Sequence, residues 1–96
     1  MNLDQRIAIV TGAGSGIGAA TAEALAAAGA SVVVTDISEK AAEQTANVIA
    51  QRGQSATALV QDVTSPEQWE QVFEAAKATF GAPNALVNNA GVSGAG

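Results

Sequence analysis

The sequence predicts an α/β protein that contains one half of a doubly wound parallel sheet. Segments with strand character alternate with helical patterns along the whole chain, as in folds with helices on both faces of a sheet. Two strand segments, residues 32–34 (Val-Val-Val) and 85–87 (Ala-Leu-Val), are continuously apolar, which is typical of parallel strands covered on both faces. A glycine-rich turn separates the first strand from the first helix. With right-handed crossovers, we expect a four-stranded parallel sheet of order 3-2-1-4 with three helices.

The expected elements follow one another without a linker between them, so residues 1–96 are interpreted as a single domain. The first helix is rich in Ala and begins near Gly16. The other expected elements are strands at residues 6–11, 31–36, 55–61 and 84–88, and helices at 39–52 and 66–79.

Both later helices have an apolar stripe at helical spacing. In the helix at 39–52 the stripe excludes Glu39 and Glu43 and consists of Ala42, Ala46 and Ile49. In the helix at 66–79 and just beyond it, the aligned residues are Trp69, Val72, Phe73, Ala76 and Phe80.

Glycines and one serine mark the helix boundaries. Gly29, Gly53 and Gly81 each follow a helical stretch, at a position where the backbone takes a positive φ. Ser65 is expected to cap the last helix, with Pro66 in its first position and Gln68 completing a capping box.

Composition excludes several classes of function. The net charge is −5, and the four basic residues are scattered, which argues against binding nucleic acid or an anionic membrane. The chain has no Cys and no His, so it has no disulfide, no thiolate metal site and no imidazole catalysis, and we expect no metal. No apolar run is long enough to span a membrane, and the first residues do not resemble a secretory signal, so we expect a cytoplasmic location.

The most informative motif is the run at residues 11–18, Thr-Gly-Ala-Gly-Ser-Gly-Ile-Gly. Its glycines allow a tight turn and a close approach of a bulky anion, and the following helix directs free N–H groups at phosphates. The alternative is a glycine-rich turn that binds nothing. Because a strand precedes the turn and a helix follows it, we interpret it as a site for a dinucleotide pyrophosphate.

Asp36 ends the second strand, about twenty residues after the glycines, where an acid can accept hydrogen bonds from both adenosine ribose hydroxyls. It would repel a 2′-phosphate, and Ser15 and Ile37 nearby are neutral, so NAD is expected rather than NADP. The alternative makes Asp36 a strand-end residue leading into a cap at Ser38.

Two further strand ends carry candidate binding residues. Asp62 could accept from the adenine amino group while Val63 packs against the ring, or Asp62 could belong only to the turn before Ser65. At residues 88–91 (Asn-Asn-Ala-Gly), the amides could join neighbouring strand ends and Gly91 could let the backbone approach a ribose. From the residues alone, an ordinary polar turn explains this segment better.

Together these motifs resemble the N-terminal half of a short-chain dehydrogenase/reductase, an NAD(P)-binding, Rossmann-like protein. The resemblance extends over essentially all of the chain. It implies that Asp36 sets the preference for NAD, that Asp62 and Val63 meet the adenine, and that Asn88 and Thr11 stabilise the sheet. The residues implied to line the pyrophosphate are Gly12, Ser15, Gly16, Ile17 and Gly18, and those implied to lie along the ribose are Asn89, Ala90 and Gly91.

The chain departs from this family in two respects. Asn84 stands where the family commonly has Asp. The family's catalytic Ser and Tyr-x-x-x-Lys pair are missing, because the chain has no Tyr, Lys40 and Lys77 lie in expected surface helices, and Ser93 follows the 88–91 motif too closely. No catalytic residue can therefore be assigned, and we expect a domain truncated after the fourth strand.

Three functions remain open at this point. The chain could be the cofactor-binding half of an NAD-dependent oxidoreductase that acts on an alcohol or carbonyl substrate, inactive by itself. It could be a stand-alone NAD-binding half-domain without turnover, or a structural fragment that binds nothing. The family is usually homo-oligomeric, and a bare fourth-strand edge would make this chain prone to self-association.

Overall fold

The computed structural model describes residues 2–89 and confirms the expected order of elements. Each element lies within one residue of the limits predicted from the sequence. The elements are β1 (Ile7–Thr11), α1 (Gly16–Ala27), β2 (Ser31–Asp36), α2 (Glu39–Gln51), β3 (Ala56–Val60), α3 (Pro66–Thr79) and β4 (Ala85–Asn88).

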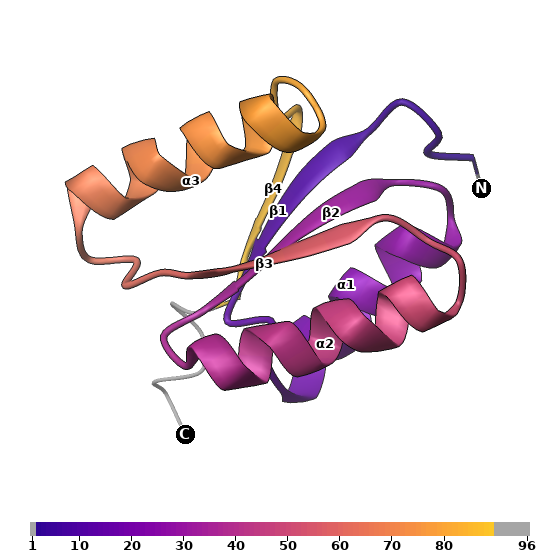
Figure 1. Cartoon of the computed structure of the whole chain (residues 1–96), viewed down its shortest axis with the longest axis horizontal. Helices are drawn as coiled ribbons and strands as arrows, with labels where there is room; N and C mark the ends of the chain where they lie inside the picture. Colours follow the sequence, from indigo (N-terminus) through magenta and orange to yellow (C-terminus); the bar gives the residue numbers. More distant parts are fainter. Residues whose placement is uncertain (1, 90–96) are drawn as a thin grey trace.

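The four strands form one parallel sheet in the order β3-β2-β1-β4, as predicted. Helices α1 and α2 cover one face of the sheet, and α3 covers the other (Figure 1). Alternation along β2 explains this arrangement, because successive side chains of a strand point to opposite faces. Val32 and Val34 pack with α1 and α2, whereas Val33 packs with α3.

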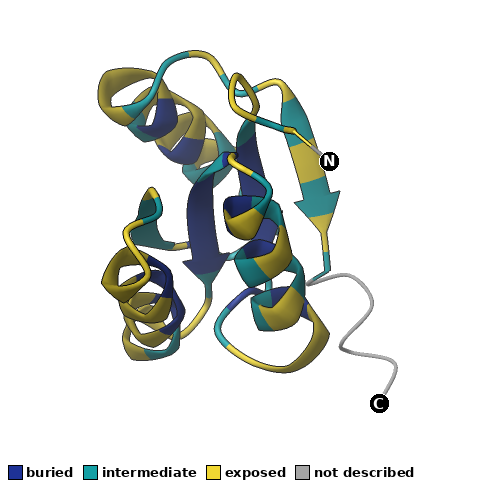
Figure 2. Ribbon diagram, turned by 90° about the vertical axis from the view of Figure 1, so that its right-hand side faces the viewer, coloured by how far each residue is buried: buried dark blue, intermediate teal, exposed yellow. Residues whose placement is uncertain are grey.

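The central strands are buried on both faces, but β4 is not. Val32, Val33 and Val34 are fully buried, as their continuous apolar run predicted. The same prediction was wrong for β4, where Leu86 is 51% exposed (Figure 2, the strand that leads to the C-terminus). Within residues 2–89, α3 packs against Ile9, Val33 and Leu59, so the face of β4 that carries Leu86 lies beyond its reach.

The helix stripes are confirmed in α2 and only in part in α3. Along α2 the buried residues are Ala42, Thr45, Ala46 and Ile49. Along α3, Val72 and Ala76 are buried, but Phe73 remains 39% exposed, so its place in the buried stripe was a wrong prediction. Phe73 instead lies beside Trp69, with ring centroids 6.4 Å apart.

The predicted positive-φ glycines are confirmed, with φ of 108° at Gly29, 77° at Gly53 and 122° at Gly81. The capping box is only half formed. The Ser65 hydroxyl accepts from Gln68 N at 3.3 Å, but the Gln68 side chain accepts from Asp62 N at 2.6 Å and not from the cap residue. The Ser65 N–H is already bonded to the Asp62 carbonyl, so the glutamine amide serves the preceding turn.

Asn84, the departure from the family pattern, uses both ends of its amide. Its Oδ1 accepts from Ile7 N at 2.9 Å, and its Nδ2 donates to the Gln5 carbonyl at 3.2 Å. An aspartate could accept the first bond but could not donate the second. The amide therefore ties the start of β4 to the start of β1.

Across the described part of the chain, no helix combines the length and the apolar character needed to cross a membrane.

Candidate cofactor site

A cavity of about 390 Å³ lies at the carboxyl ends of β1, β2 and β4. Ligands of open α/β sheets bind at this edge, outside the carboxyl ends of the strands. Seven of the eleven site residues predicted from the sequence line it, namely Gly12, Ser15, Gly16, Ile17, Gly18, Asp36 and Asn89.

A larger and more open hollow, of about 480 Å³, lies at the opposite edge of the sheet and is lined by residues 2–6 and Asn84. None of the predicted site residues lies there. We assign the candidate site to the smaller cavity, because it gathers the glycine turn, a helix N-terminus and a strand-end carboxylate.

Two glycines of the turn are required by their backbone. Gly12 and Gly16 both have φ of 60°, which L side chains rarely adopt. A Cβ at Gly18 would overlap the carbonyl oxygen of Gly12, so this glycine permits the start of α1 to pack directly on the turn. A Cβ at Gly16 would meet nothing within 4 Å, because the residue borders the open cavity.

The N-terminus of α1 differs from those of the other two helices. Ser38 and Ser65 cap α2 and α3 with their hydroxyls, but Ser15 makes no such bond at the start of α1. The first turn of α1 also contains no acidic residue. Its first N–H groups have no partner within the helix, and the residues that carry them line the cavity. Such a terminus favours an anion.

Asp36 lies on the cavity wall and holds two backbone groups. Its Oδ2 accepts from Gly14 N at 2.9 Å, and its Oδ1 accepts from Ser38 N at 3.0 Å. The second bond leads into the cap at Ser38, as expected of a strand-end residue, and Asp36 lines the cavity as well. Gly14 was expected only to help the backbone turn tightly, and its hydrogen bond to Asp36 was not predicted.

The two asparagines after β4 have different surroundings. Asn88 accepts a hydrogen bond of 2.7 Å from Thr11, which confirms that this amide joins neighbouring strand ends. Asn89 lines the cavity, and its buried Nδ2 has no hydrogen-bond partner among residues 2–89. A buried donor without a partner is unfavourable, so this amide is suited to a polar ligand.

Asp62 and Val63 do not line the cavity. The Asp62 Oδ1 accepts from the Thr64 hydroxyl at 2.6 Å and from Thr64 N at 2.9 Å, and these bonds lower the pKa of Asp62 below its ordinary value of 3.8. The Val63 carbonyl accepts from the Trp69 indole at 2.8 Å. Ala90 and Gly91, the other two predicted residues, lie outside the described residues, as does Ser93.

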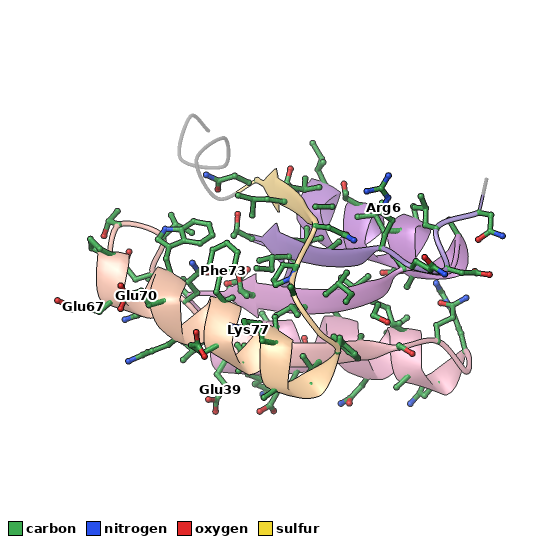
Figure 3. All side chains as sticks on the ribbon, turned by 90° about the horizontal axis from the view of Figure 1, so that it is seen from above. Arg6, Glu39, Glu67, Glu70, Phe73 and Lys77 are labelled. Atoms are coloured by element: carbon green, nitrogen blue, oxygen red, sulfur yellow. The ribbon has the colours of Figure 1, made fainter. Side chains whose placement is uncertain are left out.

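Basic side chains lie away from the cavity. Lys77 is on α3 and Arg6 is at the start of β1 (Figure 3), and among residues 2–89 no Lys or Arg lines the cavity. The described residues also contain no group of three His, Cys, Asp or Glu side chains that could hold a metal ion. The cavity therefore offers backbone N–H donors, the Ser15 hydroxyl, one carboxylate and one amide.

The parallel sheet and its glycine turn define a Rossmann-like protein, and comparison with known proteins supplies the family. Residues 6–96 match the family model described as short chain dehydrogenase. The chain therefore belongs to the short-chain dehydrogenase family, a family of oxidoreductases.

Individual relatives agree with this assignment. The chain is 44% identical over 93 residues to the 3-oxoacyl-[acyl-carrier-protein] reductase FabG of Escherichia coli, covering 97% of this chain and 37% of that protein. It is 43% identical over 91 residues to the cyclohexanol dehydrogenase of an Acinetobacter species, covering 95% and 36%. The crystal structure of a hydroxysteroid dehydrogenase from E. coli superposes with a TM-score of 0.88 at 42% identity, covering 91% of this chain and 37% of that one. The chain thus spans little more than a third of the length of these relatives.

Proposed function

We propose that this protein is an NAD-dependent oxidoreductase that transfers hydride between nicotinamide and an alcohol or carbonyl substrate. In this proposal residues 1–96 are its cofactor-binding half. One observation carries the proposal: the uncapped start of α1 and the carboxylate of Asp36 line the same cavity. The names of the relatives, a reductase and a dehydrogenase, support hydride chemistry.

The start of α1 is proposed to hold the pyrophosphate. The residues at this end are Gly12, Ser15, Gly16, Ile17 and Gly18. The three glycines leave the backbone accessible, the Ile17 side chain is largely exposed, and the positive end of the helix dipole favours the two phosphate charges. Asn89, with its unpartnered amide, is proposed to donate to a ribose oxygen, and Ala90 and Gly91 are proposed to lie beside it.

Asp36 is proposed to bind the adenosine ribose and to select NAD over NADP. A 2′-phosphate beside it would bring two negative groups together, and no Lys or Arg among residues 2–89 lines the cavity to offset their repulsion. Asp62 and Val63 are proposed to meet the adenine. The bonds to Thr64 use only Oδ1 of Asp62, and Oδ2 has no hydrogen-bond partner among the described residues.

The bound nicotinamide would carry the hydride, and the chain's own residues would bind and orient it. A proton donor is also needed, and the chain has no Tyr. We therefore expect the 96-residue chain to bind NAD without turnover. The second candidate, a stand-alone NAD-binding half-domain, rests on the same cavity. Turnover separates the two candidates. The absorbance of reduced nicotinamide should stay constant with the chain alone, and a measurable rate would contradict our conclusion that these 96 residues carry no proton donor for catalysis.

Calorimetric titration of the chain with NAD⁺ and NADP⁺ tests the binding proposal. Ile17→Asp places a carboxylate at the start of α1 and should weaken NAD⁺ binding at least about tenfold. Val48 is also an exposed apolar residue but lies on α2, so Val48→Asp is the matched control and should bind NAD⁺ as tightly as the unchanged chain does. No binding of either dinucleotide at millimolar concentration would reject the proposal, and tighter binding of NADP⁺ would reject the role of Asp36.

A further inference from the structure

Asp36 connects two loops that are far apart in the sequence. One carboxylate oxygen accepts from Gly14 N in the glycine turn, and the other accepts from Ser38 N at the start of α2. The preceding residues are joined as well, because Ala13 N donates to the Thr35 carbonyl at 2.9 Å. Two successive residues of the turn are therefore bonded to the end of β2.

The packing at Gly14 leaves no room for a side chain. A Cβ there would lie 2.8 Å from Asp36 Oδ2 and 2.5 Å from the Cβ of Ala41. These distances are shorter than van der Waals contact, so the turn, the carboxylate and the first turn of α2 are in direct contact. The position of the glycine turn and the position of the Asp36 carboxylate therefore depend on each other.

We propose that Asp36 is a positioning residue for the phosphate-binding turn, in addition to its role toward the ribose; this inference rests on the proposed function. An ionised carboxylate has about four acceptor sites, and the two backbone N–H groups occupy two of them. The other two remain for the two ribose hydroxyls. The Gly14 N–H already donates to Asp36, so the N–H groups at the start of α1 remain as the donors for the pyrophosphate.

The proposal changes what is expected of Asp36→Asn. Each carboxylate oxygen accepts one backbone N–H, so an amide in either orientation directs its own N–H donors at another donor. The variant can therefore keep only one of the two bonds, and that one without the charge, so the anchor of the turn should be weakened. The variant should bind NAD⁺ more weakly and should not gain affinity for NADP⁺, although the charge that repels the 2′-phosphate is gone.

Amide hydrogen exchange measured by NMR tests the anchor without cofactor, in the full 96-residue chain. The Gly14 N–H donates to a charged carboxylate, and hydrogen bonds to charged groups are strong. The Gly14 amide should therefore exchange with solvent at least about tenfold faster in Asp36→Asn than in the unchanged chain. Glu39→Gln is the control, because it removes a nearby charge on α2 but no bond to the turn. In this variant the Gly14 amide should exchange at the same rate as in the unchanged chain. Equal exchange at Gly14 with and without the Asp36 carboxylate would overturn the proposal.

Gly14→Ala tests the same contact from the other side and keeps the carboxylate, so it serves even where Asp36→Asn does not fold. Its Cβ should displace Asp36, accelerate exchange of the residue 14 amide and weaken NAD⁺ binding about tenfold, as expected for a misplaced binding group. If Gly14→Ala leaves both the exchange rate of the residue 14 amide and the affinity for NAD⁺ unchanged, the proposal is overturned. It is also overturned if Asp36→Asn binds NADP⁺ more tightly while its Gly14 amide stays protected. A protected Gly14 amide in a chain that binds no dinucleotide would reject the proposed function but keep the anchor.

Discussion

The hydroxyl of Thr11 donates a hydrogen bond of 2.7 Å to Oδ1 of Asn88, 77 residues later in the chain. Thr11 is fully buried at the end of β1, and Asn88 ends the neighbouring strand β4. The bond joins the two strand ends directly beside the cavity lined by Gly12 and Asn89. A side-chain pair thus fixes the sheet edge on which the candidate cofactor site is built.

Thr11→Val should therefore destabilise the chain. The substitution keeps the shape of the side chain but removes the donor, and loss of such a bond costs about 1 kcal/mol of unfolding free energy. The lowered midpoint should be visible in urea denaturation followed by circular dichroism. Thr79→Val, at an exposed position in the last turn of α3, is the control and should leave the midpoint in place. Equal midpoints for the two variants would show that the Thr11 bond contributes nothing.

Gly18→Ala should disturb both the fold and the site. The new Cβ would overlap the Gly12 carbonyl, which is backbone and cannot rotate away, so a loss of about 1–3 kcal/mol is expected. NAD⁺ binding should fall with it, because α1 must move away from the turn. Gly53→Ala is the comparison: its φ of 77° costs about 1 kcal/mol, but nothing lies within 4 Å and the site should be unaffected. Calorimetry that finds the same NAD⁺ affinity in both variants would contradict this.

Asp62 should make stability depend on pH in the acid range. Its bonds from Thr64 lower its pKa in the folded chain below 3.8, so the ionised group stabilises the fold above that value. This contribution is lost as the pH falls through the lowered pKa. Thr64→Val should be less stable than the unchanged chain at pH 7, and the difference should shrink under acid conditions. Urea midpoints measured between pH 7 and pH 2 give the comparison, and a difference that stays constant with pH would exclude the carboxylate as its source.

The exposed edge strand predicts self-association. Leu86 is half-exposed on β4, whose outer side pairs with no other strand among residues 2–89. Unpaired strand edges with apolar side chains bind further copies of a chain. Sedimentation velocity should show oligomers of the 96-residue chain, and Leu86→Lys should shift them toward monomer. Val48→Lys adds the same charge on α2 and should leave the proportion of oligomers unchanged. A monodisperse monomer of the unchanged chain would refute the expectation.

Much of the fold could be predicted because the relevant patterns are local. The continuous apolar run at residues 32–34, the stripe of Ala42, Ala46 and Ile49, and the glycines after each helix each depend on nearby residues. The same locality explains the errors. Phe73 has helical spacing, and Leu86 sits in an apolar run, but their burial depends on which neighbours the rest of the described chain brings to them.

The sequence by itself determined the class of fold, the strand order and the residues that gather around the cavity. It did so because strand, turn and helix follow from spacing, and parallel crossovers have one hand. Only the tertiary structure decided how the polar groups are paired: Asp36 with Gly14, Gln68 with Asp62, and Asn84 with the start of β1. Hydrogen bonds of this kind form only where a donor and an acceptor from separate segments come within about 3 Å of each other in a suitable orientation. No local pattern of residue types contains that information.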